Sequence, residues 1–161
     1  MKRYIKLLAA FFVVGTFCTC TKKQTDSADD LKKLLVAHNW QITQASVSPD
    51  LYSPILGGST NDYFTYFVTT CIYDNRWRFF DNNTYQWDEG ATRCNPTDPQ
   101  ISTRKWSFSL TLDAINTAEL DGSMPINYQL LMLTDYRLEV RYTIEVNGNE
   151  YEIEEQYLPE L

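Results

Sequence analysis

Hydrophobic and polar residues alternate with a period of two along most of the chain after residue 38. In the segment 105–113, one face carries only large apolar side chains, namely Trp106, Phe108, Leu110 and Leu112. This alternation is typical of a β-strand with one buried face. It recurs, less regularly, in the segments 39–47, 76–80, 84–88, 115–120 and 126–133. We therefore predict a series of short antiparallel strands joined by turns.

The strongest turn signal lies between the last two alternating segments, 136–146 and 149–157. Asn147-Gly148 separates these segments and favours a two-residue type I′ hairpin turn. Such a turn fixes the register of the two strands. Val140 is then predicted to face Glu155, and Arg141 to face Glu154 on the other side of the sheet.

About eight strands with short connections predict an all-β fold, an antiparallel up-and-down barrel of eight strands. A barrel of this size can be filled by its own side chains or can hold one small ligand. The length of 161 residues favours one domain, which we place at residues 31–161. It begins with a short amphipathic helix at residues 31–37, with Asp29 or Asp30 as N-cap and its leucines lying across one end of the barrel.

The longest irregular segment covers residues 50–70. It contains Pro54, the pair Gly57-Gly58 and an aromatic cluster that includes Tyr63 and Phe67. Long connections inside a compact domain are usually functional or contain a short helix. Two interpretations stay open: a loop packed on the outside of the barrel, or a lid over the mouth of a cavity.

The first nineteen residues are predicted to be a lipoprotein signal peptide. A basic start is followed by an apolar run from Leu7 to Phe17, which is too short to span a bilayer as a helix. The pattern that follows resembles the lipobox of bacterial lipoproteins, in which a small residue such as Thr19 precedes the modified cysteine. This favours Cys20 as the lipid-bearing residue and residues 20–30 as a flexible tether. We expect a protein anchored to the outer membrane; an ordinary signal peptide cut nearby is the alternative.

Two cysteines, Cys71 and Cys94, lie within the predicted domain. In an exported protein an even number of cysteines indicates a disulfide bond. This disulfide would close a loop of about 24 residues, which stabilises the fold by roughly 3.4 kcal/mol in the chain-entropy model. A shared metal ion is the alternative, but there is no Cys-x-x-Cys motif and His38 is the only histidine.

The charge balance and the polar residues argue against several functions. The net charge is −7, and removal of the signal peptide would make it about −10, which disfavours nucleic-acid partners. His38 precedes the first strand without a nucleophile beside it, and Asp88-Glu89 precedes Gly90 as expected for a turn. We therefore expect no enzyme, no catalytic residues, no cofactor and no metal ion.

The segment from Cys71 to Trp106 resembles a known family, the lipocalin-like domain of Gram-negative bacterial lipoproteins. The residues that carry the resemblance are Cys71, Asp74, Asn75, Trp77, Phe79, Thr84, Tyr85, Asp88, Glu89, Gly90, Ala91, Thr92, Cys94, Asn95, Pro96, Asp98, Pro99, Gln100 and Trp106. It covers roughly residues 35–158 and implies a calycin-type barrel with a disulfide between Cys71 and Cys94. Two positions depart from the pattern: Ala37-His38-Asn39-Trp40 lacks the glycine of Gly-x-Trp, and Asn83 replaces a turn glycine. The resemblance implies a fold more than an activity.

These inferences lead to two hypotheses. In the first, a monomeric, lipid-anchored barrel binds a small, partly apolar molecule through aromatic side chains. In the second, the barrel is filled and its loops dock on an outer-membrane or cell-surface partner. The candidate ligand-binding residues, which are equally well explained as core, are Trp40, Trp77, Phe79, Trp87, Trp106, Phe108 and Glu155.

Glu155 is the residue that breaks its pattern, because it shares a face with Tyr151, Ile153 and Tyr157. If that face lines the interior, the carboxyl group needs a partner, is neutral, or contacts a polar group of a ligand. Arg76 or Arg78 could be that partner. The alternative is that Glu155 lies in water at the open end of the barrel.

Overall fold

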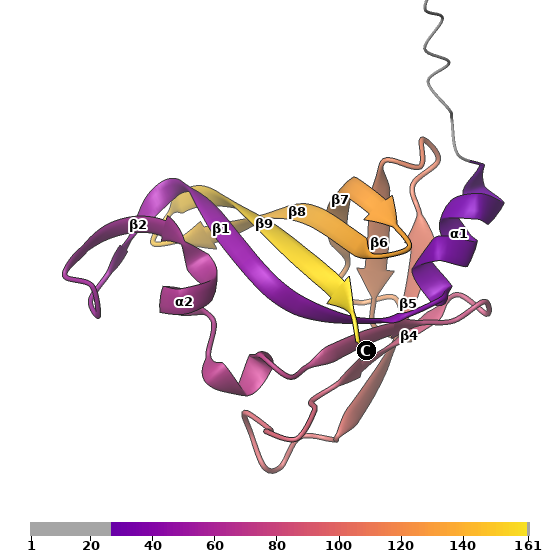
Figure 1. Cartoon of the computed structure of the whole chain (residues 1–161), viewed down its shortest axis with the longest axis horizontal. Helices are drawn as coiled ribbons and strands as arrows, with labels where there is room; N and C mark the ends of the chain where they lie inside the picture. Colours follow the sequence, from indigo (N-terminus) through magenta and orange to yellow (C-terminus); the bar gives the residue numbers. More distant parts are fainter. Residues whose placement is uncertain (1–26, 161) are drawn as a thin grey trace, which may run out of the picture.

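The alternating segments form one antiparallel sheet that closes on itself (Figure 1). The computed structural model describes residues 27–160. Its elements are α1 (Ala28–Val36), β1 (Asn39–Ser53), β2 (Gly58–Asp62), α2 (Tyr63–Phe67), η1 (Thr70–Ile72), β3 (Arg76–Phe79), β4 (Thr84–Asp88), β5 (Ile101–Phe108), β6 (Ala114–Ala118), β7 (Ile126–Thr134), β8 (Arg137–Val146) and β9 (Asn149–Pro159). The predicted signal peptide, Cys20 and most of the predicted tether lie outside the described residues.

The barrel is of the up-and-down type. Within residues 27–160, the strand order is β2-β1-β3-β4-β5-β6-β7-β8-β9, and β1 also pairs with β9. β2 pairs with the later part of β1, on the edge opposite β9. The other eight strands of the described chain form a closed ring in which each strand pairs with two neighbours. The predicted fold class is confirmed.

The last hairpin has the predicted register. Val140 pairs with Glu155 and Arg141 with Glu154, and the guanidinium Nε of Arg141 donates to the Glu154 carboxylate at 2.9 Å. Asn147 and Gly148 have φ angles of 54° and 78°, as a type I′ turn requires. The two residues of the turn therefore place Glu155 on the inner face of the barrel.

Two strands, β1 and β5, differ from the prediction by four residues or more at an end, and β5 begins earlier than predicted, at Ile101. β1 continues six residues past Val47 and, with β2, forms an arm that projects from the barrel. β5 ends at Phe108, because Ser109 and Asp113 close a tight turn in which the Ser109 hydroxyl donates to the Asp113 carboxylate at 2.7 Å. Leu110 is fully exposed in this turn, so its predicted place on the buried face is wrong.

Helix α1 covers one end of the barrel. Leu31 and Leu35 are buried there, and the Trp40 indole N–H donates to the Leu35 carbonyl at 2.9 Å. The Lys32 ammonium donates to the Asp81 carbonyl in the β3–β4 turn at 2.6 Å. The helix begins earlier than predicted, with Ser27 rather than an aspartate as its N-cap.

The interior beneath α1 is filled. The fully buried members of the core cluster that contains Leu31 and Leu35 include Trp40, Phe79, Ile115, Leu138 and Val140. In the half of the barrel beneath α1, the interior is thus a packed hydrophobic core.

Among the helices that the structure describes, none has the length and apolar character needed to cross a bilayer.

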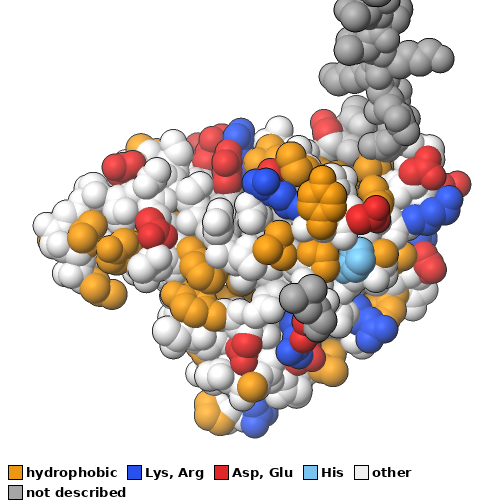
Figure 2. All heavy atoms as spheres, in the orientation of Figure 1, with side chains coloured by type: hydrophobic (Ala, Val, Ile, Leu, Met, Phe, Trp, Pro, Cys, Tyr) orange, Lys and Arg blue, Asp and Glu red, His pale blue; other side chains and the backbone are white. Residues whose placement is uncertain are grey.

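The β1–β2 arm carries apolar side chains into solvent. Tyr52, Ile55 and Leu56 are all exposed near its tip, and Figure 2 shows apolar atoms at this extremity of the molecule. At the base of the arm, the Asp62 carboxylate accepts a hydrogen bond from the Thr65 amide at 2.9 Å and so caps α2. The segment predicted to be irregular thus contains a strand and a short helix.

Candidate functional site

A cavity of about 570 Å³ lies toward the end of the barrel opposite α1. Its walls come from β1, β3, β4, β5, β7, β8 and β9, and it is covered by α2, η1 and the loop between β4 and β5. The segment that follows the arm contributes Tyr63, Phe67, Val68, Thr69 and Ile72 to this cover. Of the two interpretations of residues 50–70, the structure agrees with a lid over a cavity mouth.

Three of the candidate ligand-binding residues line this cavity: Trp77, Trp87 and Glu155. The other four do not reach it. Trp40 and Phe79 are core residues beneath α1, and Phe108 packs half-buried against that core. Trp106 is buried and borders a shallow hollow near Lys105 and Leu120, and its indole N–H donates to the Phe80 carbonyl at 3.2 Å.

The prediction missed most of the cavity wall. Tyr85, Tyr128, Tyr142 and Arg104 all line it. Three of them carry a usable signal: Tyr85 shares a strand face with Trp87, Arg104 shares one with Trp106, and the register of the last hairpin puts Tyr142 on the same face as Glu155. For Tyr128, only the pairing of β7 with β8 shows which face turns inward.

The wall is aromatic, with Trp77 at its centre. The Trp77 ring centroid lies 4.8 Å from that of Tyr157, 5.1 Å from that of Tyr128 and 5.8 Å from that of Trp87. The Trp87 indole N–H donates to the Glu89 carboxylate at 2.8 Å, whereas the buried Trp77 indole N–H has no hydrogen-bond partner among the described residues. Such a wall offers a ligand a large apolar contact area with few polar groups.

Glu155 is the carboxylic acid on the inner wall. Tyr142 donates its hydroxyl to one carboxyl oxygen at 2.8 Å, and Tyr157 donates to the other. The side chain as a whole is only partly buried, since it borders the cavity, but protein encloses its carboxyl group. Burial raises the pKa of Glu155, and the hydrogen bonds from Tyr157 and Tyr142 oppose this rise.

Of the two predicted alternatives for Glu155, the structure shows the interior position, but the suggested arginine partners are wrong. The carboxyl group is inside the barrel, and its partners are tyrosines rather than Arg76 or Arg78. Arg76 pairs with Glu160 at 2.7 Å, and the guanidinium of Arg78 lies over the Phe80 ring. The alternation pattern of a strand does not show where the strand lies around the ring, so the sequence does not indicate which side chains meet Glu155.

The tyrosines near Glu155 are held in their neutral form. Burial, followed by the nearby Glu155 carboxyl group, raises the pKa of Tyr63, Tyr128, Tyr142 and Tyr157. All four hydroxyl groups therefore keep their protons over the physiological pH range. They can donate hydrogen bonds but do not add negative charge.

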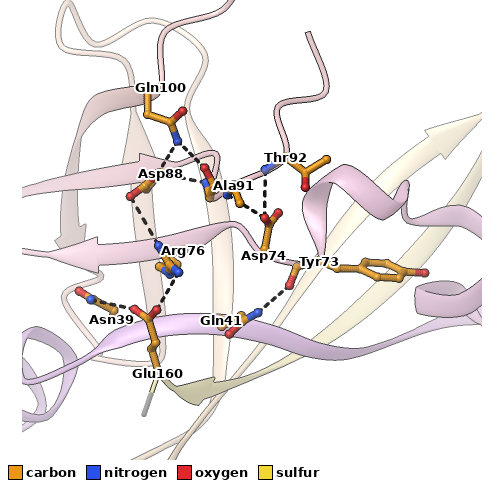
Figure 3. A network of polar contacts seen from close by, with 11 residues as sticks. Asn39, Gln41, Tyr73, Asp74, Arg76, Asp88, Ala91, Thr92, Gln100 and Glu160 are labelled. Atoms are coloured by element: carbon orange, nitrogen blue, oxygen red, sulfur yellow. Dashed lines mark hydrogen bonds and ion pairs between the residues drawn. The ribbon is translucent and has the colours of Figure 1, made fainter. Parts of the chain in front are cut away.

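A disulfide between Cys71 and Cys94 fixes the cover of the cavity. The two Cα atoms are 5.2 Å apart, and the predicted bond is confirmed. Asp74 holds the same loop, because its carboxylate accepts hydrogen bonds from the Ala91 amide at 2.7 Å and the Thr92 amide at 3.0 Å (Figure 3). The loop is thus attached to the chain segment before β3 by one covalent bond and two charge-assisted hydrogen bonds.

Gly90 makes this attachment possible. Its φ angle is +64°, and a Cβ atom at this position would lie 2.4 Å from the Asp74 carbonyl oxygen. Only glycine combines this backbone conformation with such a close approach. Gln100 completes the turn, donating to the Asp88 carboxylate at 2.8 Å and to the Gly90 carbonyl at 2.7 Å (Figure 3).

The charges around the cavity are mostly negative. Glu89, Asp98 and Glu155 line it, together with one cation, Arg104, which lies 3.0 Å from Glu119. Glu155 also borders a second groove of about 480 Å³ on the outside of β1 and β9. That groove is lined by three further acids, Asp62, Glu139 and Glu154, and by the cation Arg137.

Comparison with known proteins adds no relative to this picture. No protein-family model matches the chain, and no curated protein shows significant similarity to it. Within residues 27–160, no group of three or more His, Cys, Asp or Glu side chains is placed to hold a metal ion. The site is therefore defined by its own geometry: a half-open aromatic cavity with a buried carboxyl group.

Proposed function

We propose that this protein is a lipocalin-like lipoprotein that binds a small, partly apolar molecule in the cavity beside Trp77, without catalysis. The observation that carries the proposal is the cavity itself. Its volume of about 570 Å³ falls in the range of ~300–1,000 Å³ typical of small-molecule sites, and its wall is aromatic. A barrel that served only as a scaffold would gain stability if this space were filled.

The location of the protein is part of the same proposal. We place it outside the cytoplasm, attached through Cys20 to the outer membrane and extending from it as a monomer. The disulfide between Cys71 and Cys94 supports this placement, because such bonds persist in oxidising compartments. Labelling with a radioactive fatty acid tests the anchor: Cys20→Ser should abolish incorporation, whereas Cys18→Ser should not.

A fluorescence titration tests binding. Naphthylethanol, a neutral aromatic probe, should quench Trp77 and Trp87 and compete with any molecule that co-purifies with the protein. Tyr63→Ala, which opens the cover, should weaken this binding about tenfold, an effect of ~1.4 kcal/mol. Tyr136→Ala, an exposed tyrosine in the β7–β8 turn, is the matched control and should leave binding unchanged.

The contrary result is clear. If naphthylethanol leaves the tryptophan fluorescence unchanged and native mass spectrometry finds only the bare chain, the cavity is not a binding site. The docking hypothesis then gains weight, because the arm presents Tyr52, Ile55 and Leu56 to solvent. Replacement of these three residues by serine should, in that case, reduce chemical cross-linking to other envelope proteins in intact cells.

A further inference from the structure

We propose that the cavity selects ligands that carry a protonated amine, with the ammonium group against Glu155 and the apolar body against Trp77. This inference rests on the proposed function and specifies the chemistry of its ligand. It adds one requirement to an apolar cavity: a positive charge on the bound molecule.

The first argument is the incomplete coordination of Glu155. A carboxylate has about four positions that accept hydrogen bonds. Tyr142 and Tyr157 each donate to one oxygen. None of the ion pairs in the described chain includes Glu155. A buried carboxylate without a counter-charge is unfavourable, and an ammonium group supplies both that charge and up to three donors.

The second argument is the arrangement of the rings around this acid. Tyr142 and Tyr128 lie with their centroids 5.3 Å apart, and Tyr128 and Tyr157 both contact Trp77. The faces of Trp and Tyr rings attract cations, and sites that recognise ammonium groups are commonly lined by several of them. A carboxyl group surrounded by aromatic rings therefore favours a ligand that has both a positive charge and an apolar body over a ligand that has only one of the two.

The third argument is the electrostatic balance of the site. Three acids and one arginine line the cavity, and that arginine, Arg104, already faces Glu119. The neighbouring groove on the other side of Glu155 is also mostly acidic. A negative cleft attracts cations and disfavours carboxylates or phosphates of the same size.

Three probes of one shape test the proposal: naphthylethylamine, naphthylethanol and naphthylacetate. They share the aromatic body and differ in charge. Near neutral pH, the amine should bind at least about tenfold more tightly than the alcohol, and the acetate should bind most weakly. Equal affinities for all three would overturn the amine selectivity and leave the proposed cavity function intact, whereas no binding of any probe would contradict both.

Two neighbouring variants locate the selectivity. Glu155→Gln keeps the size of the side chain and one accepting oxygen, so that one tyrosine still donates to it while the other must accept from the amide NH2 group. It removes the charge and should bring the affinity for the amine close to that for the alcohol. Glu152→Gln is the control, since the Glu152 carboxylate lies toward Arg141 and lines neither the cavity nor the acidic groove, and should keep the preference. A preference that survives in the folded Glu155→Gln variant would exclude Glu155 as its source.

The pH dependence gives an independent readout. Burial raises the pKa of Glu155, so the group ionises at a higher pH than an ordinary glutamate. Affinity for the amine should therefore decrease as the pH falls through this raised pKa, while affinity for the alcohol stays constant. On the cavity side, the groups that face Glu155 are Tyr63, Tyr128, Tyr142 and Tyr157, which stay neutral, with the cation Arg104 across the cavity. On the side of the outer groove, the charged groups are Asp62, Arg137, Glu139 and Glu154.

The pH dependence of amine binding must be corrected for the other acidic residues that line the cavity. Glu89 and Asp98 also line the cavity, and both are present in the wild-type protein and in Glu155→Gln. The pH dependence attributed to Glu155 is thus the difference between the wild-type protein and Glu155→Gln. An identical pH profile in both proteins would contradict the proposal.

Discussion

The two ends of the barrel are built from the same strands but differ in their contents. β3 contributes Phe79 to the packed core beneath α1 and, two residues away, Trp77 to the wall of the cavity. At the packed end, the indole N–H of Trp40 is bonded to a backbone carbonyl. At the hollow end, two tyrosine hydroxyl groups converge on one carboxyl group, that of Glu155. The position of a residue along its strand, rather than its chemical type, decides whether it packs in the core or borders the cavity.

The largest expected effect is on the free energy of unfolding, and it differs between the packed end and the hollow end. Phe79→Ala removes a fully buried ring and should lower the free energy of unfolding by about 3–5 kcal/mol. Phe67→Ala removes a half-buried ring from the cover and should cost only about 1 kcal/mol. Urea unfolding measures both values, and probe titration should show weaker binding only for Phe67→Ala. Similar losses of stability in the two variants would mean that the cover is as well packed as the core.

The next effect concerns the disulfide at the hollow end. The double replacement Cys71→Ser and Cys94→Ser should lower the free energy of unfolding by about 3.4 kcal/mol, because it restores the entropy of an open loop to the unfolded chain. Hydrogen exchange should show faster exchange at Ala91 and Thr92, with little change in α1. An unchanged urea midpoint would show that Asp74 and Gln100 alone hold the loop.

The smallest effect tests the close approach at Gly90. Gly90→Ala should destabilise the fold by about 1–3 kcal/mol, since it adds a clash with Asp74 to an unfavourable backbone conformation. Gly122→Ala is the matched control: its φ angle is also positive, at +89°, but nothing lies within 4 Å of the added methyl group. Gly122→Ala should therefore cost less, about 1 kcal/mol. Equal melting temperatures for the two variants would contradict the proposed role of the contact with Asp74.

The fold was largely predictable because its signals are local. Alternation identified most strands, and Asn147-Gly148 set the register of β8 and β9. The errors also have local causes. Leu110 continues the apolar pattern of β5 in the sequence, but the strand ends at Phe108, where the hydrogen bond between the Ser109 and Asp113 side chains closes a turn.

The cavity was less predictable, because it depends on which residues meet across the ring. Glu155 was identified from the hairpin alone, since its register with Val140 follows from two turn residues. The wall around it combines residues from seven strands, and their relative depth is set by barrel closure. Three residues on which the predicted resemblance rests, Asp74, Gly90 and Cys94, hold the loop over the cavity rather than contact its centre.

The pairing of β1 with β9 has a consequence for how this chain folds. The Thr43 hydroxyl donates to the Gln156 carbonyl at 3.3 Å, a contact between residues 113 positions apart. The β8–β9 hairpin can form as soon as its turn exists, but the seam between β1 and β9 cannot form until residues 149–159 have been made. Contacts of such long range slow folding, so we expect closure of the seam to limit the folding rate. Removal of the final strand would leave two unpaired edges and a nascent chain prone to aggregate.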